Sequence, residues 1–286
     1  MLAEPCIAPS VVVGADFSLG GQNALARAVD VARSSGASVE IVHAVPRRPQ
    51  PSLASIGDDD ERAREARAAM DEIVGEVRAS GVDARLRLAR SSAVRGLRDA
   101  AAEPAVMLVV VGARGRAVSD ALLGSTAERI AFHARPPVLL VRRPAREPYR
   151  RVLVAVDARG DVRRELDAAR LVAPDAEVAF LHAYEALHET NLVLAGATQA
   201  SLSLHQRQAR REARAALVRD LARANVRDPH LLLRHGNRRF VLEREARRPS
   251  NELVVLERSR SATRRFLLGG DARAVIAHGT TDVLLV

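Results

Sequence analysis

The 286-residue chain contains no lysine, no tryptophan and only one cysteine. The lone cysteine, Cys6, excludes an internal disulfide and a cysteine metal cluster. Because lysine is absent, the 44 lysine and arginine positions of the chain are all arginines. So complete an exclusion indicates a codon bias towards arginine rather than a functional site.

Long apolar runs are also missing. No run of about 18 apolar residues occurs, so no membrane-spanning helix is expected. The first residues, Met-Leu-Ala-Glu-Pro-Cys, carry an acid where a signal peptide needs positive charge. Together these absences predict a cytoplasmic protein.

Aromatic residues make up only 2% of a chain whose formal net charge is +9. A basic chain can attract nucleic acid, but here the arginines are interleaved with acids, as in Asp60-Glu61-Arg62. So few aromatic side chains offer no stacking platform for bases. Specific binding of nucleic acid is therefore not expected.

An internal repeat is the main feature that the sequence does contain. V-V-V-G-A-R-G at Val109 matches V-V-L-E-R-S-R at Val254, and A-L-L-G-S-T at Ala121 matches F-L-L-G-G-D at Phe266, both at an offset of 145 residues. A length of 286 residues suits two domains of about half that size. The repeat predicts two copies of one domain, over residues 1–144 and 149–286.

Short apolar runs alternate with helical patterns through both copies. In the first copy the predicted strands cover residues 11–15, 38–44, 82–89, 106–111 and 138–141. Strands that alternate with helices pair in parallel, so each copy is predicted to be an α/β Rossmann-like domain with a five-stranded parallel sheet and helices on both faces. A ligand crevice is expected where the first and fourth strands end. His43 in the second strand is predicted to have a packing role only.

The stretch from Val109 to Val141 combines glycines with a helix start. Gly112 and Gly115 follow the fourth strand, and Gly124 precedes Ser125, which can cap a helix with Glu128 three residues further on. Free amides at such a helix N-terminus favour an anion such as phosphate. The alternative is that the glycines serve only tight packing, and the spacing by itself leaves both interpretations open.

This pattern resembles the nucleotide-binding motif of the universal stress protein family, Gly-x2-Gly-x9-Gly followed by Ser or Thr and then by a strand after Pro-Val. Here the second gap has eight residues rather than nine, and the strand follows Pro137-Val138. The resemblance extends through both copies, so the chain looks like a tandem member built from two HUP-type domains.

The resemblance implies a stress-response protein that binds ATP, or another adenine nucleotide, with Mg²⁺ as an accompanying ion. It places Asp16, at the end of the first strand, near the base, although Asp16 could instead cap the following turn. The residues implied at the ribose and phosphates are Gly112, Arg114, Gly115, Gly124, Ser125 and Thr126. Arg114 could alternatively be an exposed loop arginine.

The resemblance further implies a binding or regulatory role with slow or no ATP hydrolysis. It also implies pairing of the two domains through their last strands, Val138–Val141 and Val283–Val286, and leaves a homodimer open. Two alternatives are a nucleotide-dependent enzyme of the same fold and an interaction module that needs no ligand.

The second copy has lost the residues of the motif. At the offset of 145, Gly112 becomes Glu257, Gly115 becomes Arg260, Ser125 becomes Gly270 and Thr126 becomes Asp271. Two carboxylates would repel a phosphate, and Asp271 can cap the helix amides itself. The sequence therefore predicts a second domain that keeps its fold without a nucleotide site, although Asp157 persists at the place of Asp16.

Overall fold

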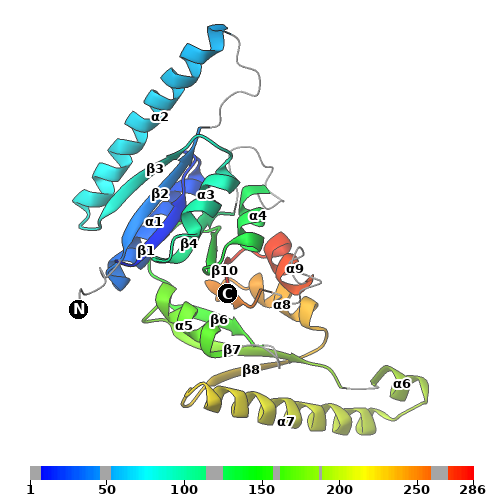
Figure 1. The fold of residues 1–286 in the computed structure, drawn as a ribbon. Coiled ribbons are helices and arrows are strands. Elements are labelled where there is room, and N and C mark those ends of the chain that lie inside the picture. Colours follow the sequence, from blue (N-terminus) through cyan, green and yellow to red (C-terminus); the bar gives the residue numbers. More distant parts are fainter. Residues whose placement is uncertain (1–7, 46–52, 114–124, 157–161, 187–188, 259–269) are drawn as a thin grey trace. The chain divides into compact units, whose positions relative to one another are not determined.

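The computed structural model describes residues 8–45, 53–113, 125–156, 162–186, 189–258 and 270–286. The chain separates into two compact units, the first ending at Pro148 and the second beginning at Tyr149. Each unit alternates strands and helices (Figure 1). This arrangement confirms the predicted α/β fold class with two Rossmann-like domains.

The sheet of the first unit has five strands in the order β3-β2-β1-β4-β5. The four pairs of neighbouring strands are all parallel. The strands are β1 (Ser10–Gly14), β2 (Ser38–Ala44), β3 (Ala84–Ala89), β4 (Val106–Gly112) and β5 (Val138–Val141). The chain leaves β1 towards β2 on one side and returns later to β4 on the other, so the strand order reverses between β1 and β4.

Four helices connect these strands. They are α1 (Leu19–Ser35), α2 (Leu53–Ala79), α3 (Ala93–Ala101) and α4 (Ser125–His133). The Ser92 hydroxyl accepts a hydrogen bond from the Arg95 amide and caps α3. Helix α1 begins directly after Ser18, whose hydroxyl oxygen accepts a hydrogen bond from the Gly21 amide and caps the helix.

The five strands of the second unit follow the order β10-β9-β6-β7-β8. Its strands are β6 (Arg151–Ala155), β7 (Glu177–Tyr184), β8 (His230–His235), β9 (Leu253–Leu256) and β10 (Asp282–Leu285). Its helices are α5 (Val162–Val172), α6 (Glu189–Leu194), α7 (Gln199–Arg223), α8 (Arg238–Ala246) and α9 (Gly270–His278). Helix α9 starts 145 residues after α4, which matches the offset read from the sequence.

The central strands carry the core of each unit. Val12 in β1 and Val109 in β4 are fully buried, as are Val154 in β6 and Val254 in β9. Strands covered on both faces need continuous apolar runs, which is the pattern that the sequence shows here. The polar residues that follow the strands are consequently brought to the carboxyl edge of the sheet.

Candidate functional site

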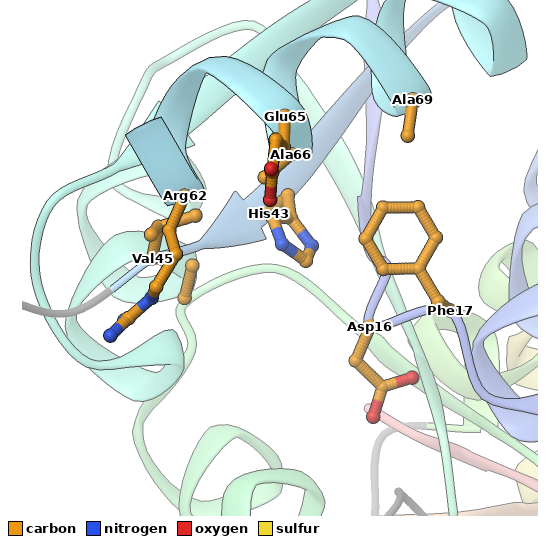
Figure 2. A pocket seen from close by; sticks show the side chains of 9 residues that line it. Asp16, Phe17, His43, Val45, Arg62, Glu65, Ala66 and Ala69 are labelled. Atoms are coloured by element: carbon orange, nitrogen blue, oxygen red, sulfur yellow. The ribbon is translucent and has the colours of Figure 1, made fainter. Parts of the chain in front are cut away.

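The carboxyl ends of β1 and β2 open into a pocket of about 660 Å³ in the first unit (Figure 2). Its walls come from the turn after β1, the end of β2 and one face of α2. The lining residues are Asp16, Phe17, His43, Ala44, Val45, Arg62, Glu65, Ala66 and Ala69. A concave site with apolar walls and a few polar groups is typical of small-ligand binding. Asp16, the predicted base-facing residue, is therefore at a pocket.

Asp16 also organises the turn that leads into α1. Its Oδ1 accepts a hydrogen bond from the Ser18 amide at 3.1 Å and another from the Ser18 hydroxyl. The hydroxyl oxygen of Ser18 accepts in turn from the Gly21 amide at 3.0 Å. The turn-capping interpretation is thus correct for Oδ1, while Oδ2 has no hydrogen-bond partner in the part of the chain that the structure describes. Oδ2 is therefore able to accept a hydrogen bond from a ligand.

Phe17 occupies an unusual backbone conformation at the pocket. Its φ of 58° lies in the left-handed region, which costs a non-glycine residue about 1–2 kcal/mol. The side chain is 39% exposed, and its ring centroid lies 4.9 Å from that of His43. Strain of this kind tends to be retained at functional sites. Phe17 was not predicted as a site residue, because a single aromatic residue in a turn belongs to no periodic pattern.

His43 lies at the end of β2 with only 9% of its surface exposed. Its Nδ1–H donates to the carbonyl oxygen of Ala15 at 2.7 Å. The hydrogen bonds between β1 and β2 continue beyond the end of β1, because the Ala15 amide donates to the carbonyl oxygen of Val42 at 3.1 Å. The predicted packing role is therefore present, but His43 also lines the pocket, which no pattern in the sequence predicted.

Gly112, the first glycine of the motif, ends β4 where another backbone comes very close. A Cβ at this position would lie 2.6 Å from the carbonyl carbon and oxygen of Gly20 at the start of α1. Only glycine permits that approach. The packing interpretation therefore accounts for Gly112, and the contact ties the end of β4 to the turn that carries Asp16.

The structure describes only some of the remaining motif residues. Helix α4 begins at Ser125, as predicted, with Thr126 half-buried and Glu128 in the first turn. Neither Gly112 nor Thr126 belongs to the lining of the pocket. The other predicted site residues, Arg114, Gly115 and Gly124, lie outside the described residues.

In the second unit an arginine bridges the corresponding elements. Arg238, in the first turn of α8, pairs with Asp271 of α9, its Nε lying 3.1 Å from Oδ2. The same guanidinium donates to the carbonyls of Val156 at 2.8 Å and Ala155 at 3.3 Å, at the end of β6. At the offset of 145, the first unit has Ala93 and Thr126 at these two positions.

One feature of the first pocket recurs in the second unit. His182 in β7 places its Nδ1 3.2 Å from the carbonyl oxygen of Val156. This contact corresponds to the one between His43 and Ala15. Asp157 and Arg260, which correspond in the sequence to Asp16 and Gly115, lie outside the described residues.

The described residues contain neither a helix long and apolar enough to cross a membrane nor a group of three side chains suited to hold a metal ion. The fold and the pocket at the carboxyl ends of β1 and β2 define the class: a doubly wound α/β domain, present twice, of the kind that binds small ligands at a sheet edge. The family model described as "Universal stress protein family" matches residues 9–142 and again residues 148–286. The chain therefore belongs to this family, as its resemblance to the motif predicted.

Two solved structures illustrate the likeness over nearly the whole chain. A functionally unknown protein from Pseudomonas aeruginosa PAO1 is 18% identical, with 98% of this chain and 92% of that one covered and a TM-score of 0.68. A universal stress protein from Archaeoglobus fulgidus DSM 4304 is 16% identical, with 96% and 97% covered and a TM-score of 0.67. At such identities the likeness shows the fold alone. Among curated proteins, none matches the chain.

Proposed function

We propose that the first domain, residues 1–144, binds an adenine nucleotide, with ATP as the first candidate, and that the protein has a binding or regulatory role in a stress response. The observation that carries the proposal is the pocket in which Asp16 and Phe17 lie beside the carboxyl ends of β1 and β2. Ligands of doubly wound sheets collect at this edge. Phe17 supplies an exposed ring on which a base can stack, and Oδ2 of Asp16 is available to accept a hydrogen bond from the ligand.

We assign the base to the side of Asp16, and the ribose and phosphates to the glycine motif and the start of α4. The residues of that second part are Gly112, Arg114, Gly115, Gly124, Ser125 and Thr126. The support for it is the helix start at Ser125, whose free amides favour an anion. Since no metal-ligating cluster occurs among the described residues, Mg²⁺ would be held mainly by the phosphates, as is usual for this ion.

The second domain, residues 149–286, serves in this proposal as a partner that keeps the fold without a nucleotide site. The two domains pair through their last strands, Val138–Val141 and Val283–Val286, because short apolar edge strands tend to pair. A homodimer of the whole chain is compatible with this arrangement. The proposed location is the cytoplasm, and ATP hydrolysis is at most slow.

The direct experiment is to denature the purified protein and identify any nucleotide that it releases, followed by calorimetry with ATP. We expect an adenine nucleotide and saturable binding. Gly115→Arg places a long side chain in the glycine motif and should abolish binding while the circular dichroism spectrum is kept. Gly75→Arg is a matched control, since Gly75 is exposed on α2 with open space around it. Equal ATP affinity in both variants would refute the assignment of the motif.

A further inference from the structure

We propose that His43 selects the base: its Nε2 accepts a hydrogen bond from the exocyclic amino group of adenine, so that the site prefers a 6-aminopurine over a 6-oxopurine. This inference rests on the proposed nucleotide site of the first domain. It concerns a residue to which neither the family motif nor the sequence pattern assigns a ligand role.

The hydrogen bond to β1 determines which ring nitrogen of His43 remains for a ligand. A backbone carbonyl can only accept, so the 2.7 Å contact between Nδ1 and the Ala15 oxygen requires the proton on Nδ1. In the neutral ring Nε2 then carries no proton and is an acceptor. This nitrogen has no hydrogen-bond partner among the described residues, although the side chain is 91% buried, as its 9% exposed fraction implies. Nε2 itself keeps some exposed surface, so a donor that enters the pocket can approach it.

Two other polar side chains of the pocket are also hydrogen-bond acceptors. Asp16 and Glu65 also line the pocket and, as carboxylates, can only accept. Figure 2 shows that Glu65 comes from α2, whereas Asp16 comes from the turn after β1. Among the described residues of the lining, Arg62 is the cationic side chain. A pocket with three acceptors therefore favours a ligand group that donates, such as an amino group, over a carbonyl oxygen.

The apolar part of the lining suits a flat ring. Phe17 presents its ring beside His43, and Val45, Ala66 and Ala69 complete the wall. Stacking on an aromatic side chain is indifferent to the identity of the base, because every base has a π-face. Selection between purines must therefore come from the polar edge, where Nε2 lies.

The test compares ATP with ITP, which differs by a carbonyl oxygen in place of the amino group, in calorimetry on the full-length protein. Wild-type protein should bind ATP at least about tenfold more tightly than ITP, the discrimination expected when an acceptor is left facing an acceptor. His43→Asn can still donate to the Ala15 carbonyl from its side-chain amide but has no group at the place of Nε2. We expect about a tenfold loss of ATP affinity with unchanged ITP affinity.

The second unit offers a matched control. His182→Asn alters the equivalent histidine, whose Nδ1 contacts the Val156 carbonyl, and should leave both affinities unchanged. His43→Gln, which carries an amide oxygen near the place of Nε2, should retain the preference for ATP, and it decides the matter if His43→Asn does not fold. Equal affinities of wild-type protein for ATP and ITP, or equal losses for both nucleotides in His43→Asn, would overturn the inference while the proposed site stands. Absence of any ATP binding by the wild-type protein would instead refute the proposed function itself.

Discussion

Arg238 and Asp271 form an ion pair across the second unit, with 3.1 Å between Nε and Oδ2. The guanidinium also donates to the last carbonyls of β6, on Ala155 and Val156. One arginine thus joins the strand end to the first turn of α9. The charged side chains of Arg238 and Asp271 thus lie where the first unit has the uncharged residues Ala93 and Thr126.

This ion pair strengthens the expectation that the chain has one nucleotide site rather than two. A phosphate at the start of α9 would have to displace Arg238 from Asp271 and would then face the Asp271 carboxylate. Titration of the intact protein with ATP should therefore saturate at one nucleotide per chain. Two equivalent sites in calorimetry would show that this account of the second domain is wrong.

Gly112→Ala should destabilise the first domain. The added Cβ would lie 2.6 Å from the backbone of Gly20, and backbone cannot move aside as a flexible side chain can. We expect a loss of about 1–3 kcal/mol in the free energy of unfolding, measured by urea denaturation. Gly75→Ala is the control, because nothing lies within 4 Å of a Cβ there. It should stabilise α2 by about 0.5–1 kcal/mol, and equal effects of the two changes would contradict the close approach.

Phe17→Gly tests the contribution of the aromatic ring to binding separately from the strained backbone conformation at this position. Glycine relieves the left-handed conformation, so the free energy of unfolding should stay the same or rise by up to about 1 kcal/mol. Loss of the ring should weaken ATP binding by about tenfold, the scale of one base stacked on an aromatic side chain. Phe240→Ala removes another exposed phenylalanine, on α8 of the second unit, and should leave ATP binding unchanged. Unaltered affinity in Phe17→Gly would remove the ring from the site.

Deletion of Val283–Val286 tests the proposed pairing of the last strands. If the domains pair there, the first domain should lose stability too, and amide hydrogen exchange in β4 and β5 should accelerate. Leu253→Ala is the comparison, since Leu253 is fully buried in β9 and its truncation weakens the second domain without removing its last strand. Unchanged exchange in the first domain after the deletion would count against the pairing.

Local patterns in the sequence were enough to predict the architecture. Continuous apolar runs predicted the buried strands, and the constant offset between Val109 and Val254 predicted two copies, because a repeated core pattern folds in the same way twice. Ser125 was predicted to open a helix, and α4 begins at this residue. Each of these features depends on residues close together in the chain, where the periodicity of the backbone determines which side chains are buried.

The details of the site were decided by tertiary structure. The contact of Gly112 with Gly20, the hydrogen bond from His43 to Ala15 and the bridge from Arg238 to Asp271 join residues between 28 and 92 positions apart. No local periodicity encodes such pairs, because they form only when separate strands and helices pack at one sheet edge. The sequence therefore determined that a crevice would form where parallel strands end, whereas packing determined which side chains lie there: the rings of Phe17 and His43 in the first unit, and an internal ion pair in the second.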